Sequence, residues 1–210
     1  MLRAPPAGFE RVELVLLEVD PAVLLRLAFR TRASQLGFRA TAEFRFDAPK
    51  GEFGVLYAAF DLSTAFAEAV LRTVPQDVAP GEEPLLTYEE LARRRVVQLA
   101  AVPGGRPLRL VKLYDEGLAA AKGDNRIATD DDYVSSRRWA KAFHDHPAKV
   151  DGIAYLSRFM GSRRSVALFD RSAALIRRDR VTPLLTHPDF SRLVRDFRLA
   201  ISRPRRRRRS

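Results

Sequence analysis

The residues of this chain with the greatest capacity for chemistry are polar side chains placed inside apolar segments. Arg26 lies in PAVLLRLAF, Tyr57 in FGVLYAAF, Glu68 in STAFAEAVLR and Ser157 in DGIAYLSRF. Burying a charged group costs several kcal/mol unless the group is paired or performs a function. Arg26 and Glu68 therefore indicate either a structural ion pair or a functional site.

These side chain types suit particular tasks. The planar guanidinium of Arg26 could bind a phosphate through two parallel hydrogen bonds, and the carboxylate of Glu68 could stabilise developing positive charge. Each residue also has a structural explanation. Glu68 could pair with Arg26 or Arg45, and Tyr57 could be a core residue whose hydroxyl bonds the backbone. If Arg26 has buried partners, removing it would also destabilise the fold.

The surrounding elements are those of one α+β domain, with no internal repeat and no linker. Apolar segments predict buried strands at 22–29 and 53–60 and a strand at 152–159. A helix is expected over 63–73, with Asp61 or Ser63 as its cap. Residues 12–20 fit either a strand or a helix. Further strands are expected near 43–46 and at 96–102, 108–113 and 165–170, and further helices after Thr87 and over 130–146 and 187–201.

Composition narrows the protein class. The 210 residues include 37 Lys and Arg, 26 Asp and Glu and no cysteine, giving a net charge of +11. Six of the arginines lie in the last eight residues, and such a run is typical of a disordered tail that binds nucleic acid weakly. The sequence has no apolar run long enough for a membrane span and no secretory signal, so we expect no membrane association. The lack of cysteine fits a cytoplasmic location.

Common catalytic motifs are missing. The sequence has no glycine-rich dinucleotide fingerprint, no P-loop, no G-x-S-x-G and no H-E-x-x-H. His144 and His146 lie two positions apart on a predicted helix and would point in different directions. We therefore expect a solvated helix end there and no metal site.

Several segments, taken in order, resemble the RES domain. They are RFDAP, FGVLYAAFDLSTAFAEAVLR, NRIATDDDYVSSRRWAKAFHDHPAKVDGIAYLSRF and SVALFD. This family is named for an Arg, a Glu and a Ser, and its members are commonly toxins of bacterial toxin–antitoxin pairs. The similarity covers about residues 22–170. The chain differs from the family at AEFRFDAPKGEFG and at Leu25, where an aromatic residue is common.

The resemblance implies a compact α+β domain with mixed or antiparallel sheets and flanking helices, related to the ADP-ribosyltransferases. It implies NAD as the substrate, bound in a cleft, with cleavage of its nicotinamide–ribose bond. Some members consume NAD by hydrolysis or phosphorolysis, and others transfer ADP-ribose to a protein. No metal is required by this chemistry.

Family positions transfer to five residues of this chain. The resemblance assigns Arg26 and Arg45 to the pyrophosphate and Glu68 to the ribose and its developing charge. It assigns Tyr57 to the nicotinamide or ribose, through its ring face and hydroxyl, and Ser157 to a hydrogen bond with the nicotinamide amide or ribose. Arg26, Tyr57 and Glu68 are thus the expected catalytic residues, without a covalent nucleophile.

The resemblance also implies a domain organisation and a partner. Residues 1–21 would be an N-terminal extension, 22–202 the RES-like domain and 203–210 a disordered basic tail. The partner would be a cognate antitoxin with an Xre-like helix-turn-helix, through which the complex contacts DNA. The sequence leaves the oligomeric state open, a homodimer included.

Three other functions stay open at this point. The first is a mono-ADP-ribosyltransferase that modifies a protein. The second is a non-catalytic nucleic-acid-binding protein, whose binding would depend steeply on salt and would be lost when residues 203–210 are deleted. The third is a catalytically inactive relative, although the matched family positions are retained.

Overall fold

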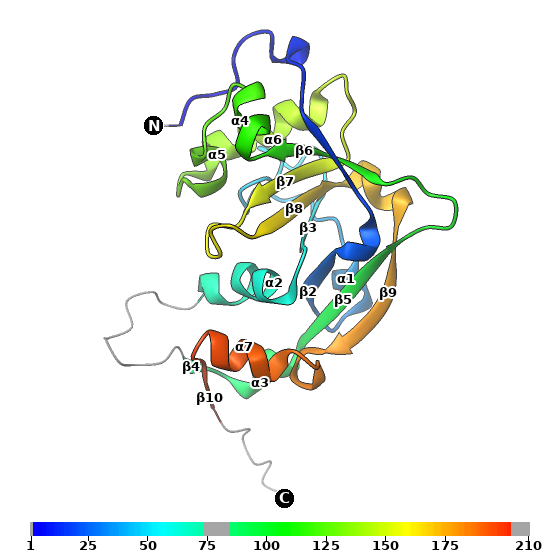
Figure 1. The fold of residues 1–210 in the computed structure, drawn as a ribbon, viewed down its shortest axis with the longest axis vertical. Helices are drawn as coiled ribbons and strands as arrows, with labels where there is room; N and C mark the ends of the chain where they lie inside the picture. Colours follow the sequence, from blue (N-terminus) through cyan, green and yellow to red (C-terminus); the bar gives the residue numbers. More distant parts are fainter. Residues whose placement is uncertain (1, 74–84, 203–210) are drawn as a thin grey trace, which may run out of the picture.

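A mixed sheet of eight strands organises the computed structural model, which describes residues 2–73 and 85–202 (Figure 1). The strand order is β1-β6-β7-β8-β3-β2-β5-β9; neighbouring strands run antiparallel except β6 and β7, which are parallel. The strands are β1 Leu16–Val19, β2 Leu25–Phe29, β3 Val55–Ala59, β5 Arg94–Ala101, β6 Leu108–Leu113, β7 Gly152–Leu156, β8 Arg164–Phe169 and β9 Ile176–Pro183.

Helices pack on this sheet at separate places. Figure 1 shows α4, α5 and α6 together beside β6 and β7, while α2 contacts β2 and β3. The α-helices are α1 Arg32–Gln35, α2 Leu62–Ala69, α3 Tyr88–Ala92, α4 Asp115–Ala120, α5 Arg126–Thr129, α6 Tyr133–Asp145 and α7 Phe190–Asp196. Short 3-10 helices are η1 Phe9–Arg11, η2 Pro21–Val23, η3 Leu71–Thr73, η4 Asp170–Leu175 and η5 Leu184–Thr186. This arrangement confirms the predicted α+β class with a mixed sheet.

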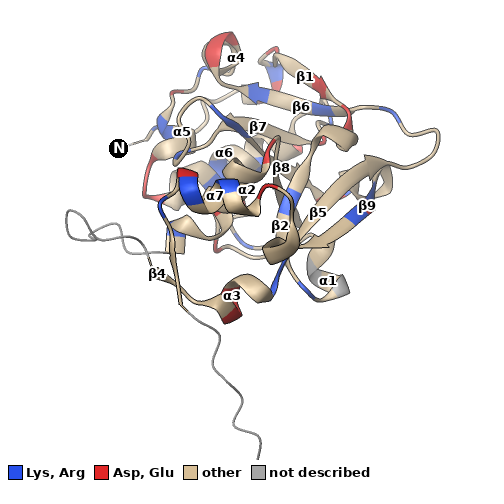
Figure 2. Ribbon diagram, turned by 60° about the horizontal axis from the view of Figure 1, so that its bottom comes forward, with Lys and Arg blue, Asp and Glu red and all other residues tan. Residues whose placement is uncertain are grey.

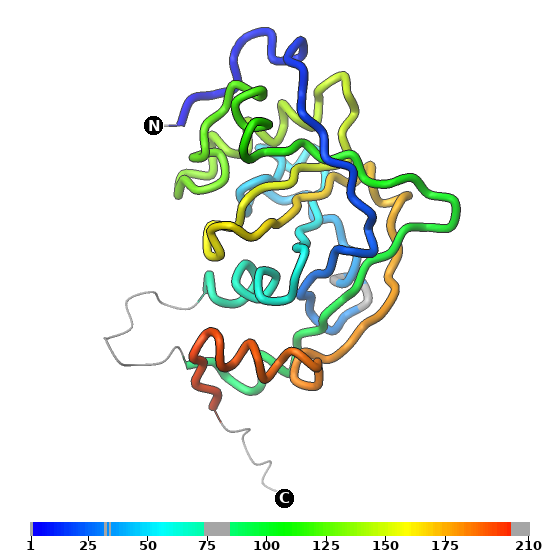
Figure 3. The backbone as a smooth tube through the Cα atoms, viewed as in Figure 1, coloured from blue at the N-terminus to red at the C-terminus, as the bar shows by residue number. Residues whose placement is uncertain are grey.

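A second, two-stranded sheet joins distant parts of the chain. Strands β4 (Leu85–Leu86) and β10 (Ala200–Ile201) pair in parallel. The tube in Figure 3 shows the red C-terminal segment returning beside the green one that contains β4 and α3. The predicted basic tail, 203–210, lies outside the described residues.

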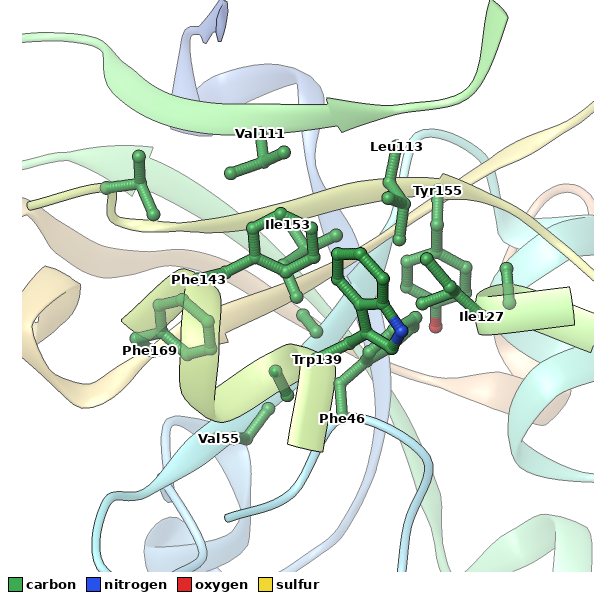
Figure 4. Close-up of a cluster of buried hydrophobic side chains, with 14 of the residues drawn as sticks. Phe46, Val55, Val111, Leu113, Ile127, Trp139, Phe143, Ile153, Tyr155 and Phe169 are labelled. Atoms are coloured by element: carbon green, nitrogen blue, oxygen red, sulfur yellow. The ribbon is translucent and has the colours of Figure 1, made fainter. Parts of the chain in front are cut away.

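Much of the core lies between the sheet and α6. Figure 4 shows Trp139 and Phe143 of α6 packed with Ile153, Tyr155 and Phe46, all of which are buried. The N-terminal segment belongs to the same core, because the buried ring of Phe9 packs edge-on against Trp139 and Phe143 at centroid distances of 5.3 and 5.4 Å. Residues before β2 therefore pack as part of one domain.

Local signals in the sequence explain several element boundaries. Asp61 caps α2, because its Oδ1 accepts a hydrogen bond from the Thr64 amide at 2.9 Å. Thr87 caps α3 in the same way, through Glu90 N at 3.2 Å. Gly152 is required by close packing of β7 on β8, since a Cβ there would lie 2.4 Å from the Ala167 carbonyl oxygen.

The helix predicted over 187–201 is shorter than expected: α7 covers Phe190–Asp196, and Ala200–Ile201 form strand β10. The secondary structure differs from the sequence-based expectation at two other places. Residues 43–46 form turns instead of a strand, because Asp47 Oδ2 accepts hydrogen bonds from the Glu43 and Phe44 amides at 3.1 and 2.9 Å. The Asp47 side chain thus accepts backbone hydrogen bonds that a neighbouring strand would otherwise accept. Strand β9 was not predicted, because its arginine-rich sequence lacks an apolar alternation.

The surroundings of His144 and His146 also differ from the predicted solvated helix end. The His144 ring stacks on Phe53 at a centroid distance of 4.0 Å. His146 is buried, with Nε2 3.1 Å from the Val12 carbonyl oxygen and Nδ1 accepting from the Ala148 amide at 3.2 Å. Both are packing residues at the end of α6 instead of solvated ones. They do point to different surroundings, as their spacing predicts.

The distribution of charged residues over the fold agrees with a composition rich in both basic and acidic residues. Figure 2 shows basic residues on elements throughout the fold, including β2, β6 and β9, interspersed with acidic segments. In the part of the chain that is described, no helix has the length and apolar character needed to cross a membrane.

Candidate active site

A cleft opens where the sheet splits between β2 and β3. These strands pair at one position, Leu25 opposite Ala59, whereas β2 continues along β5 and β3 along β8. The divergence borders a cavity of about 1020 Å³, large enough for a small-molecule substrate. The polar and charged residues that line it are Arg26, Thr31, Arg39, Arg45, Tyr57, Glu68, Arg72, Thr73, Arg94, Asp131, Tyr133, Tyr155, Arg158 and Ser165.

Arg26 occupies the position where β2 leaves β3. Its Nε and Nη1 atoms are buried and have no hydrogen-bond partner among the described residues. Burial, followed by the nearby charge of Arg39, lowers the pKa of Arg26 to about 10, so the side chain is still cationic at neutral pH. Unpartnered buried N–H groups are rare in proteins. This arginine therefore presents hydrogen-bond donors that suit an anionic ligand.

Glu68 is held in place by Ser157. Glu68 lies in the last turn of α2, and Ser157 follows the end of β7. Ser157 Oγ donates a hydrogen bond to Glu68 Oε1 at 2.6 Å and accepts one from the Met160 amide at 3.3 Å. The carboxylate is thereby oriented in the wall of the cavity before any ligand binds, which favours electrostatic stabilisation of a cationic centre.

Arg45 lines the cavity close enough to Glu68 for the two charges to interact. Its guanidinium is 4.6 Å from the centre of the Tyr133 ring, and Nη1 donates to the Asp130 carbonyl oxygen. Burial lowers its pKa, against opposing contributions that include Glu68. Arg158, which forms an ion pair with Asp131, adds a second cation to the cavity lining.

Tyr57 supports the loop that carries Arg45. Its hydroxyl donates to Asp47 Oδ1 at 3.0 Å and accepts from the Phe46 amide at 2.9 Å. Asp47 is buried and also accepts a hydrogen bond from Thr41 Oγ1 at 2.7 Å. Burial raises the pKa of Tyr57 well above its usual value, so the hydroxyl stays protonated and continues to donate. The ring of Tyr57 lines the cavity, but its hydroxyl is committed to the loop.

Asp47→Asn is expected to lower the free energy of unfolding by about 1–3 kcal/mol, because an amide cannot replace both carboxylate oxygens as acceptors for buried donors. Chemical denaturation measures this change. Asp124→Asn, at an exposed pair with Arg126, is the matched control and should change stability by less than about 0.5 kcal/mol. An unchanged midpoint for Asp47→Asn would contradict the assigned network.

The model of the RES domain matches residues 23–192. The chain belongs to the RES domain family. A chain of the crystal structure of the M. tuberculosis MbcT–MbcA toxin–antitoxin complex is similar in fold, with a TM-score of 0.59 and 14% sequence identity over 90% of this chain and 98% of that chain. No curated protein matches the sequence significantly.

Within the RES domain, the residues expected from sequence come together. Arg26, Arg45, Tyr57 and Glu68 all line the cavity, and Ser157 reaches it through its hydrogen bond to Glu68. In this structure the Ser157 hydroxyl donates to the Glu68 carboxylate, and its expected contact with a substrate stays a prediction. These residues lie on β2, β3, α2 and two loops.

Sequence reasoning missed several other lining residues. Tyr155 and Arg158 flank Ser157 in the Y-x-S-R block, and Arg72 lies one helical turn beyond Glu68, so spacing could have indicated them. Arg39 and Arg94 lie in segments with no pattern that distinguishes them from surface arginines. Their part in the site depends on the fold alone.

The cavity is strongly basic. Six arginines line it, against the two carboxylates of Glu68 and Asp131. Such a site favours ligands that carry several negative charges. Among residues 2–73 and 85–202, no group of His, Asp and Glu side chains is arranged to hold a metal ion.

Proposed function

We propose that this RES-domain protein binds NAD in the cleft and cleaves the bond between nicotinamide and ribose. The observation that carries the proposal is that one cavity contains both a cationic group with free donors and an oriented anionic group. Arg26 presents buried N–H groups without acceptors, and Glu68 presents a carboxylate oriented by Ser157. NAD combines a diphosphate anion with a cationic nicotinamide ring, so it matches both features.

Binding would use the arginines. The diphosphate of NAD would accept hydrogen bonds from Arg26, whose Nε and Nη1 lack partners in the ligand-free protein. Arg45 would contribute through donors other than Nη1, which bonds the Asp130 carbonyl. Tyr155, which interacts with Glu68, and Tyr133, which lies under Arg45, would supply aromatic walls for the nicotinamide end.

Cleavage would use Glu68. The C1′–N bond of the nicotinamide ribose breaks, and its electron pair leaves with nicotinamide, which becomes neutral. Positive charge then develops on the ribose ring, as in glycoside cleavage, and the Glu68 carboxylate stabilises it. An acceptor oxygen forms the new bond to C1′ and loses its proton, if it carries one, to solvent. Ser157 keeps the carboxylate oriented throughout.

The biological setting we propose is a toxin–antitoxin pair. Membership in the RES family and the similarity in fold to a chain of a toxin–antitoxin complex support this setting. The partner would be an antitoxin with an Xre-like helix-turn-helix that covers the cleft and prevents NAD from entering. The site of action would be the cytoplasm, where NAD is available.

The purified protein is expected to release nicotinamide from NAD. Three parallel reactions, in buffer alone, with inorganic phosphate and with cell extract, identify the acceptor from the product: ADP-ribose, phosphorylated ADP-ribose or a modified protein. Formation of modified protein alone would favour the mono-ADP-ribosyltransferase alternative. Absence of nicotinamide in all three reactions would contradict the proposed chemistry.

A further inference from the structure

The cavity has two chemically different halves. One half contains Glu68 and Arg45, which both act electrostatically on the buried Tyr155, together with Tyr133, whose ring lies under the Arg45 guanidinium. Arg72 also acts on Tyr155, so it lies between the two halves. The other half contains arginines and phenylalanines. The guanidinium of Arg94 lies 4.1 Å from the centre of the Phe29 ring, and those of Arg72 and Arg39 lie 4.5 and 5.9 Å from that of Phe44.

The arginine-rich half brings like charges together. Arg39 lowers the pKa of Arg26, after the larger effect of burial. Burial also lowers the pKa of Arg94, and Arg72 acts in the same direction against the opposing effect of Glu90. Clustered cations repel one another, and that repulsion is relieved when an anion binds between them.

Among the described residues, two acidic side chains form ion pairs with this cluster. Arg39 contacts Glu43 at 3.7 Å between exposed side chains, and Arg94 contacts Glu90 at 3.5 Å. These are the ion pairs within 4 Å that the cluster makes among the described residues. Arg94 Nε is buried and, like Nε and Nη1 of Arg26, has no hydrogen-bond partner there. The site therefore offers donors to more than one anionic group.

NAD does not supply enough negative charge for these groups. Its diphosphate carries two negative charges, which one or two arginines can bind. A phosphate monoester at the 2′ position of the adenine ribose adds about two more. In dinucleotide-binding proteins, a nearby arginine commonly accommodates that 2′-phosphate. Phe29 and Phe44 provide aromatic faces beside the arginines for the adenine.

We propose that the preferred substrate of this site is the 2′-phosphorylated dinucleotide, NADP, and that Arg94 binds its 2′-phosphate. This inference rests on the proposed function, because it names the substrate of the same cleft. Arg26 then binds the diphosphate, and Glu68 acts at the nicotinamide ribose. The 2′-phosphate lies at the far end of the substrate from the reacting bond, so it contributes to binding.

The test compares nicotinamide release from NADP and from NAD by the full chain. We expect kcat/KM to be about 10- to 100-fold higher for NADP, as a hydrogen-bonded charge pair implies. Arg94→Gln should remove most of this preference, chiefly by lowering kcat/KM for NADP. Arg180→Gln, at an exposed position of β9, is the matched control and should preserve the preference.

A binding measurement separates this inference from the proposed function. Calorimetric titration with adenosine 2′,5′-bisphosphate and with 5′-AMP requires no catalysis. Tighter binding of the bisphosphate, lost in Arg94→Gln, would support the 2′-phosphate site even if neither dinucleotide were cleaved. Equal affinities for the two nucleotides, or a kcat/KM for NADP no higher than for NAD, would overturn the inference and leave Glu68-dependent cleavage of NAD intact.

Discussion

Glu68→Gln is expected to lower kcat for nicotinamide release by about 10²- to 10³-fold, with KM changed by less than about threefold. The amide retains the size of the carboxylate, and its oxygen can still accept the hydrogen bond from Ser157 Oγ. It carries no negative charge, so it cannot stabilise the cationic ribose. The loss therefore falls on the transition state. Initial rates of nicotinamide release over a range of dinucleotide concentrations measure both constants.

The control for this variant is a carboxylate outside the cleft. Glu116 of α4 pairs with Lys112 at an exposed position, and Glu116→Gln should leave both constants unchanged. Thermal unfolding should show that Glu68→Gln is folded, with a midpoint within a few degrees of the original. Full activity of Glu68→Gln in a folded protein would show that another residue carries the reaction.

Arg26→Met is expected to change binding and stability in opposite directions. Substrate KM should rise by at least about tenfold, because the diphosphate loses a charged partner. The free energy of unfolding should increase by about 1–2 kcal/mol, because a cation whose Nε and Nη1 are buried without partners is replaced by an apolar side chain of similar length. This result would contradict the expectation from sequence that removing Arg26 leaves buried partners without a hydrogen bond and destabilises the fold.

Two measurements decide this prediction. Chemical denaturation in the absence of substrate gives the stability, and nicotinamide release gives KM. Arg180→Met, on the exposed part of β9, controls for the loss of a positive charge and should affect neither. A large loss of stability in Arg26→Met would show that Arg26 nitrogens make structural hydrogen bonds in solution, and a proposed substrate contact would then lose its main support.

Many elements follow from consecutive residues. The apolar run in FGVLYAAF predicts the buried strand β3, and Asp61 with Thr64 marks the start of α2. The position of Glu68 on that helix is local as well. These predictions hold because backbone hydrogen bonding and burial repeat over a few residues, so a short segment contains the information.

Other features depend on contacts between distant segments. Residues 43–46 have a strand-like sequence, but the hydrogen bonds to Asp47 and its link to Tyr57 create turns there. Arg94 lies in a run of three arginines, and only the fold separates the one that lines the cavity from exposed Arg93 and half-buried Arg95. No local sequence pattern predicts the turns at 43–46 or the place of Arg94 in the cavity.

The sequence alone determined the family, the α+β class and the five candidate residues, because these are properties of residue order and local pattern. Only the tertiary structure decided how those residues act. It placed the hydroxyl of Tyr57 on Asp47, joined Ser157 to Glu68 and gathered Arg26, Arg72 and Arg94 around one cavity. The physical reason is that a cleft forms where two strands diverge, and that divergence is set by packing among segments far apart in the chain.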